Sequence, residues 1–218
     1  MTYSVKEIYL TVQGEGAQTG LPAVFLRFAG CNLWSGIEKD RASAVCKFCD
    51  TDFVGIDGPN GGKFKTASVL VEAVGKHWPS LDQKESGQPW VICTGGEPLL
   101  QLDEPLIEAF HQAGFKVAVE TNGTIKAPKG LDWICVSPKA NAELVQTSGN
   151  ELKLVYPQVE NKPEDFTHLD FKNFCLQPRD DSYLGEKKAA HEQAAFDYCL
   201  AHPQWRLSVQ THKYLGVP

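Results

Sequence analysis

The sequence lacks any hydrophobic run long enough to cross a membrane, which requires about 20 apolar residues. Its first residues, MTYSVKEIYLTVQGEG, also lack a positively charged start followed by an apolar segment, so no secretory signal is visible. Acidic residues outnumber basic ones by 27 to 21, and the formal net charge of -6 argues against non-specific binding to nucleic acid. We therefore expect a cytoplasmic protein that binds neither membranes nor nucleic acids.

The chain has seven cysteines, and an odd number without an export signal argues against a disulfide framework. Cys31, Cys46 and Cys49 are gathered with the spacing C-x14-C-x2-C. Thiolates suit zinc or iron–sulfur clusters, but a closed zinc site needs four ligands and only three gather here. The pattern favours an iron–sulfur cluster with one iron open to a ligand that is not protein. A thioredoxin-like redox pair and a zinc knuckle are the alternatives for C-x-x-C alone.

Apolar runs alternate with amphipathic segments along the 218 residues, which predicts a single α/β domain. Because strands and helices alternate, we expect βα units and a mainly parallel sheet, with too few strands for a full eight-unit barrel. An open or partial barrel is the predicted fold. Strands are predicted at 23–28, 89–93, 115–121, 132–136, 152–156, 173–176 and 206–210, and helices at 66–78, 103–113 and 185–201.

Polar motifs follow these apolar runs: CDT, TGGEP, ETNG, SPK, QPRD and QTHK. In parallel α/β folds the carboxyl ends of the strands form the ligand site, so we expect these motifs to share one face. Arg27 lies inside a predicted strand and must be paired or face a polar cavity. The four remaining cysteines, Cys93, Cys135, Cys175 and Cys199, are interpreted as structural residues rather than ligands.

Cys46-Lys47-Phe48-Cys49 and Thr94-Gly95-Gly96-Glu97-Pro98 together resemble the radical S-adenosylmethionine (SAM) enzymes. The usual signature of that superfamily is C-x3-C-x-aromatic-C, and its GGEP motif contacts the methionine end of SAM. In this chain fourteen residues, instead of three, separate the first cysteine from the second. Segment 35–45 is charged and polar, so we predict that it is an inserted surface loop. Such an insertion costs little stability, because the entropy of loop closure grows only with the logarithm of loop length.

The resemblance is closer to one family, 7-carboxy-7-deazaguanine synthase. It rests on EIYLTVQGEG, LRFAGCN, CKFCDT, TGGEPLLQ, ETNGT, SPK, ELKLV, LQP and QTHKYLG, in that order over nearly the whole chain. It implies a shortened, modified radical SAM barrel, generally a homodimer. It also implies ring contraction of 6-carboxy-5,6,7,8-tetrahydropterin to 7-carboxy-7-deazaguanine with release of ammonia, in queuosine and deazapurine biosynthesis. The implied cofactors are a 4Fe–4S cluster, SAM and Mg2+, with a reduced flavodoxin- or ferredoxin-type electron donor.

The resemblance further implies roles for individual residues, none of them an acid or a base, because the radical chemistry belongs to the cofactor. Cluster ligands would be Cys31, Cys46 and Cys49, and Thr51 would bind Mg2+, which usually keeps several waters. The SAM site would comprise Phe48, Cys49, Asp50, Gly96, Glu97, Ser137, Pro138, Lys139, Gln177, Pro178, Arg179 and Asp180. The substrate site would comprise Val12, Gln13, Gly14, Glu15, Arg27, Thr94 and Pro218, with the Arg27 guanidinium on the substrate carboxylate.

Two other classes of protein stay open from the residues alone. One is a different radical SAM enzyme, such as an activase that generates a glycyl radical on a partner; QGEG and THKYLG are not expected there. The other is a non-catalytic iron–sulfur or zinc module, which has no need of TGGEP. For the chain end, we expect the Pro218 carboxylate to accept hydrogen bonds from the pterin, the alternative being a frayed terminus.

Overall fold

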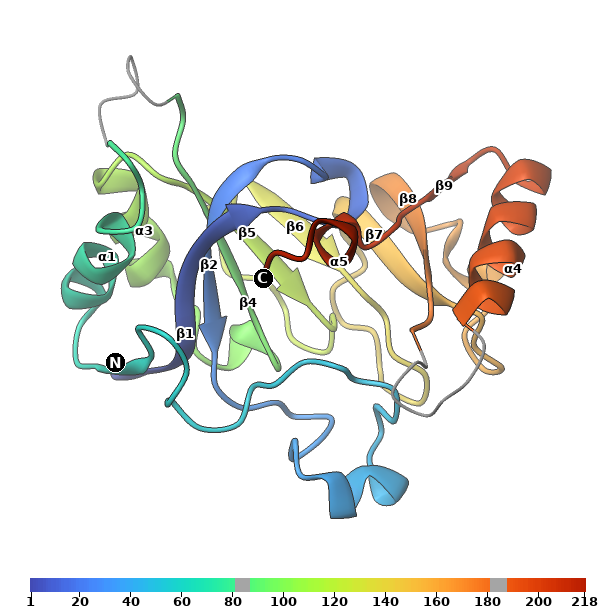
Figure 1. The fold of residues 1–218 in the computed structure, drawn as a ribbon, viewed down its shortest axis with the longest axis horizontal. Helices are drawn as coiled ribbons and strands as arrows, with labels where there is room; N and C mark the ends of the chain where they lie inside the picture. Colours follow the sequence, from blue (N-terminus) through green and yellow to red (C-terminus); the bar gives the residue numbers. More distant parts are fainter. Residues whose placement is uncertain (81–86, 181–187) are drawn as a thin grey trace.

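The computed structural model describes residues 1–80, 87–180 and 188–218. Within these ranges one nine-stranded sheet, in the order β3-β1-β2-β4-β5-β6-β7-β8-β9, curves around the centre of the molecule (Figure 1). The strands are β1 Tyr3–Val12, β2 Pro22–Phe28, β3 Gly62–Phe64, β4 Trp90–Gly95, β5 Lys116–Thr121, β6 Trp133–Val136, β7 Ser148–Tyr156, β8 Asp170–Pro178 and β9 Trp205–Leu207.

Helices cover the outer side of the sheet, with α1 and α3 at one end and α4 at the other (Figure 1). The α-helices of the described ranges are α1 Ala67–Gly75, α3 Glu104–Gln112, α4 Lys188–Ala201 and α5 Thr211–Leu215. Short 3-10 helices are η1 Gly16–Gln18, η2 Glu38–Ser43, η3 Pro98–Leu100 and η4 Pro163–Phe166. None of the helices in the described ranges is long and apolar enough to cross a membrane.

The sheet is parallel from β2 through β9, whereas β1 runs antiparallel to β2 and to β3. The middle residues of the central strands β4 and β5 are apolar because both faces are covered there; Val91, Ile92 and Val117 are completely buried. The predicted mainly parallel partial barrel is therefore confirmed.

The N-cap of α3 was visible in the sequence. Asp103 precedes α3 and its Oδ1 accepts a hydrogen bond from the Leu106 amide at 3.0 Å, which satisfies a free N–H of the first turn. The same oxygen accepts the Tyr3 hydroxyl at 2.8 Å and so ties α3 to β1. Leu106 and Phe110 then point into the main core, which orients the helix against the sheet.

Several predicted boundaries are wrong at the chain end. The last strand ends at Leu207 rather than at residue 210, although the Ser208 amide still donates to the Leu176 carbonyl at 2.8 Å. The chain then turns because the Thr211 amide donates to the Gly14 carbonyl at 2.8 Å, and α5 begins at Thr211. The predicted helix 185–201 is confirmed from Lys188 on, and residues 185–187 lie outside the described residues.

Several features were not predicted from the sequence. Strand β1 is ten residues long, β3 pairs with it, α5 lies near the chain end, and the segment 35–45, expected as a surface loop, contains η2. The helical turn of η2 follows from local hydrogen bonds, including Ser43 Oγ to the Asp40 carbonyl at 3.0 Å.

Candidate active site

Two adjoining cavities open at the carboxyl ends of the parallel strands. The first lies toward β6, β7 and β8, and the second lies toward β1, β2 and the end of the chain. They share part of their walls, so a molecule in one cavity would lie against a molecule in the other. The shared residues are Glu15, Asp50, Thr51, Thr94, Glu120 and Gln210.

Most residues predicted for SAM line the first cavity. These are Phe48, Cys49, Asp50, Gly96, Ser137, Lys139, Gln177, Pro178, Arg179 and Asp180. Glu97 and Pro138 are not among its lining residues. The geometry gathers ten residues from four separate segments of the chain around one space.

All residues predicted for the substrate line the second cavity: Val12, Gln13, Gly14, Glu15, Arg27, Thr94 and Pro218. Thr51, predicted for Mg2+, lies between the two cavities and lines both. The second cavity is therefore lined by residues of β1 and β2, by the loop that connects these two strands and by the last residue of the chain.

The three predicted cluster ligands lie within electrostatic reach of one another. Burial raises the pKa of Cys46; the Lys139 ammonium opposes this, and Cys49 and Cys31 raise the pKa further. Burial also raises the pKa of Cys31, with Cys49 among the smaller contributions. Among the described residues no group of three potential ligands already stands at metal-binding distances, and all seven cysteines are free thiols.

This donor set fits an iron–sulfur cluster. Three soft thiols lie near one another beside a cavity that Cys46 and Cys49 line, and Cys46 is buried while Cys31 and Cys49 are half-buried. Gly96 keeps the end of β4 close to this group, because a Cβ there would lie 2.6 Å from Cys31 Cβ. A larger residue at Gly96 would push Cys31 away from the other two thiols.

Glu97 is completely buried beneath the cavities. Its carboxylate accepts hydrogen bonds from Leu99 N at 2.9 Å, Thr121 Oγ1 at 2.7 Å and Asn122 N at 2.8 Å. Burial raises the pKa of Glu97, and these donors oppose that effect. The carboxylate thus joins the loop after β4 to the loop after β5.

Arg27 lies in the wall of the second cavity. Its Nε donates to Glu7 Oε1 at 2.7 Å and its Nη2 donates to the Tyr9 hydroxyl at 2.9 Å. The Arg27 side chain is only 18% exposed, so its charge needs a partner, and the ion pair with Glu7 provides it, as the sequence predicted. The guanidinium still borders the cavity, where a bidentate anion could reach it.

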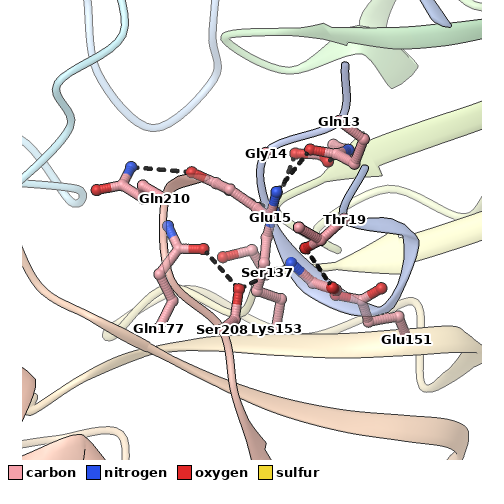
Figure 2. Close-up of polar contacts among 12 residues, drawn as sticks. Gln13, Gly14, Glu15, Thr19, Ser137, Glu151, Lys153, Gln177, Ser208 and Gln210 are labelled. Carbon is pink, nitrogen blue, oxygen red and sulfur yellow. Dashed lines mark hydrogen bonds and ion pairs between the residues drawn. The ribbon is translucent and has the colours of Figure 1, made fainter. Parts of the chain in front are cut away.

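The loop after β1 is held from several sides. The Gln13 side chain donates to Glu120 Oε1 at 2.6 Å and accepts from the Glu15 amide at 3.0 Å. Figure 2 shows Glu15 linked to Gln210, whose Nε2 donates to Glu15 Oε1 at 2.9 Å. Ser208 Oγ accepts from the Gly16 amide at 2.7 Å, below the loop. The loop is therefore a fixed wall of the site and not a simple turn.

The chain end closes over the same region. Lys213 on α5 contacts Asp180 at 2.7 Å and Asp50 at 3.1 Å, and so connects segments that border the first cavity. Thr11 Oγ1 donates to a terminal carboxyl oxygen of Pro218 at 3.0 Å. The last residue thereby reaches the second cavity and is held there by β1.

Sequence reasoning missed site residues that lie inside strands or just after them. Lys153 and Glu120 line the first cavity together with Thr121, Asn122, Cys135, Val155 and Gln210. The signal for Lys153 and Glu120 was a charged residue within an apolar run, the same signal that singled out Arg27.

Comparison with known proteins gives a consistent result, although no protein-family model matches the chain. The 7-carboxy-7-deazaguanine synthase of Caulobacter vibrioides is 64% identical over 221 residues, with 100% of both chains covered. That of Burkholderia multivorans is 58% identical over 218 residues, again with 100% of both chains covered. The chain belongs to the 7-carboxy-7-deazaguanine synthase family. The crystal structure of QueE from Escherichia coli is also similar, with a TM-score of 0.67 and 25% identity, covering 96% of this chain and 94% of the other.

Membership of the 7-carboxy-7-deazaguanine synthase family extends over the whole chain and so includes both cavities. It decides against the two other classes that the residues alone left open, a glycyl-radical activase and a non-catalytic iron–sulfur module. The motifs that carried the resemblance lie around the cavities, since QGEG, TGGEP, SPK and LQP all contribute lining residues.

Proposed function

We propose that this chain converts 6-carboxy-5,6,7,8-tetrahydropterin to 7-carboxy-7-deazaguanine and ammonia. The observation that carries the proposal is the full-length identity of 64% and 58% to two proteins named as that synthase. The product and ammonia together contain all the atoms of the substrate, so the net reaction needs neither an oxidant nor a reductant. It does need a way to break strong bonds in the ring, which the cofactor must supply.

Cys31, Cys46 and Cys49 would hold a 4Fe–4S cluster, and SAM would occupy the first cavity beside it. When bound, the cluster and SAM supply a carbon-centred radical. The chain's part is to hold the two molecules in one place: Gly96 allows close approach, and Ser137 and Lys139 border the same space. Lys139 Nζ donates to Ser137 Oγ at 2.6 Å, which fixes the ammonium near the thiols.

The second cavity would hold the pterin. Arg27 would bind the substrate carboxylate while Glu7 keeps the guanidinium oriented. Thr94 lies in the wall common to both cavities, so the ring would be held against the cofactor there. Orientation of this kind lowers the barrier because the reacting atoms need not find each other.

Thr51 would be the protein ligand of Mg2+, which would also bind the substrate carboxylate. One hydroxyl suffices, since Mg2+ binds oxygen and keeps several of its waters. Thr51 lines both cavities and therefore stands where such an ion would meet the substrate. For Thr51→Ala we expect turnover to need a much higher Mg2+ concentration; an unchanged Mg2+ dependence would remove Thr51 from the site.

The decisive experiment is an anaerobic assay of the reconstituted enzyme with the pterin and SAM, with 7-carboxy-7-deazaguanine detected by mass spectrometry. Cys46→Ala should abolish both the cluster spectrum and SAM cleavage. Cys199→Ser is the matched control, because that cysteine lies on α4, away from the cavities. No product from a fully loaded wild-type enzyme would refute the proposed function.

The remaining parts of the proposal concern the protein's surroundings. We propose a single domain with the inserted segment 35–45, a homodimer, a reduced flavodoxin- or ferredoxin-type donor and a cytoplasmic location. The free thiols suit a reducing compartment. Light scattering of the purified protein tests the dimer, and turnover driven by either donor in place of dithionite tests the electron source.

A further inference from the structure

Lys153 lies near the middle of β7, and its side chain is only 5% exposed. Residues alternate along the strand: Leu152 and Leu154 are completely buried in the core, while Lys153 and Val155 line the first cavity. An ammonium group removed from water must be paired with charge to be tolerated. The buried ammonium of Lys153 therefore requires carboxylates close to it.

Two carboxylates meet that demand. Lys153 Nζ lies 2.6 Å from Glu15 Oε2 and 3.1 Å from Glu120 Oε2. Glu120 is on β5, so the lysine reaches across β6. The sheet register places Cys135 between the two strands, paired with Glu120 on one side and with Glu151 on the other. A small residue at Cys135 leaves the space through which Lys153 reaches Glu120.

Hydrogen bonds close these contacts into a ring. Glu120 Oε1 accepts from Gln13 Nε2 at 2.6 Å, and Gln13 Oε1 accepts from the Glu15 amide at 3.0 Å. The Glu15 carboxylate then accepts a hydrogen bond from Lys153 Nζ, which completes the ring. The position of the loop after β1 and the position of the ammonium are therefore set together.

The ring holds two carboxylates for one ammonium and forms part of the wall common to both cavities. Burial raises the pKa of Glu15, but the Lys153 ammonium, helped by the Gln210 hydrogen bond and by His212, more than offsets this, so the pKa lies well below the usual range. Other titratable groups face the ring from the same strand and from neighbouring elements: Glu151 on β7, Cys135 on β6, Cys175 on β8, Tyr9 on β1 and His212 on α5.

We propose that Lys153 is a positioning residue for the substrate: its ammonium holds Glu15 and Glu120 together as ionised carboxylates, which present acceptor oxygens to N–H donors of a heterocycle in the second cavity. The identity of that heterocycle rests on the proposed function. Glu15 and Glu120 line the second cavity, whereas Lys153 lines the first, so the lysine acts on the substrate through the two carboxylates.

A distinctive result follows if the ammonium is removed. Two carboxylates left together without a cation cannot both ionise easily, and one of them takes up a proton. At low pH a carboxyl–carboxylate hydrogen bond then replaces the ammonium in part, and at high pH repulsion opens the ring. Loss of Lys153 should therefore make substrate affinity depend on pH more steeply than in the wild type.

The test measures binding of the pterin and of SAM to anaerobic, cluster-loaded Lys153→Met by calorimetry between about pH 6 and pH 8. We expect pterin affinity to fall about 30-fold or more at the higher pH, to recover partly at the lower pH, and SAM affinity to stay within about twofold. Lys153→Arg, which keeps the charge, should retain most of the affinity and the pH profile of the wild type. Lys76→Met is the control, because it removes an exposed ammonium that pairs with Glu72 on α1.

Equal losses for pterin and SAM, or a loss independent of pH, would overturn the proposal and leave Lys153 a purely structural residue. If Lys153→Met does not fold, 13C-carboxylate spectra of the wild type still test it: Glu15 must remain ionised on acidification to about pH 4, and protonation above that would overturn the proposal. A wild type that turns over the pterin while Lys153→Met binds it normally would refute this inference alone. A wild type without turnover would refute the proposed function instead.

Discussion

The guanidinium of Arg41 donates a hydrogen bond from Nη1 to the carbonyl oxygen of Cys49 at 3.0 Å. The same nitrogen donates to the Lys47 carbonyl at 3.1 Å, and the guanidinium carbon lies 4.1 Å from the ring centroid of Trp34. Arg41 belongs to the segment inserted between the first and second of the three gathered cysteines. The insertion thus supports the backbone around Cys46 and Cys49 from outside.

We predict that Arg41→Ala weakens retention of the cluster without unfolding the protein. The two carbonyls would lose their donors, and the C-x-x-C backbone would move more freely, which exposes the thiols to solvent. Iron should be lost to a chelator several-fold faster, and the decay of the cluster's visible absorbance measures this rate. Lys39→Ala, an exposed residue of the same helical turn, is the control; equal rates in both variants would show that Arg41 has no such role.

Glu97 is predicted to be mainly a structural residue of the site. Glu97→Gln keeps the size of the side chain but replaces one acceptor oxygen by an NH2 group, a donor that would face other donors, so at least one of three buried hydrogen bonds is lost. We expect the free energy of unfolding to fall by about 1–3 kcal/mol, measured by chemical denaturation of the apoprotein. Glu108→Gln on the exposed face of α3 should change stability little. A Glu97 variant of wild-type stability that fails to bind SAM would instead support the contact first predicted for it.

The fold was largely predictable where buried strands are apolar throughout, as in Val91-Ile92-Cys93 of β4. Strand β1 was not, because Lys6 and Glu7 interrupt its apolar pattern. Lys6 is tolerated there since Asp52 and Asp57, which follow it by 46 and 51 residues in sequence, lie 2.9 and 2.8 Å from its ammonium. No local pattern can reveal a partner so distant along the chain.

The same distinction holds for the site. Residues that follow strands, such as Ser137 and Arg179, were predictable because the carboxyl ends of parallel strands meet at one edge. Lys153 and Glu120 lie within strands, and their role depends on contacts across β6 that only the register defines. Segment 211–215 was left without structure because its helix depends on contacts with the loop at Gly14.

Arg27→Ala should cripple pterin binding and leave SAM binding nearly intact. Loss of one partner of a buried ion pair typically costs about 3–5 kcal/mol, and here Glu7 would remain without its cation next to the substrate carboxylate. The double variant Arg27→Ala/Glu7→Gln should regain stability but not pterin affinity, because the guanidinium is still missing. Calorimetry with both ligands separates these outcomes; equal losses for SAM and pterin in Arg27→Ala would indicate general unfolding.

The last prediction concerns the chain end, which lies beside α5 and over the open side of the sheet (Figure 1). Gly216 ends α5 in the left-handed conformation, with φ 65°, and the final two residues then run to the Pro218 carboxylate held by Thr11. A carboxylate only accepts hydrogen bonds, which suits the N–H groups of a pterin in the second cavity. Deleting Val217 and Pro218, or extending the chain with a C-terminal tag, should therefore raise KM for the pterin much more than KM for SAM. The same tag at the N-terminus, where Met1 is exposed, serves as the control. Unaltered pterin kinetics in the tagged and the truncated enzyme would show that Pro218 is an ordinary frayed terminus, because a carboxylate that binds substrate cannot be moved without cost.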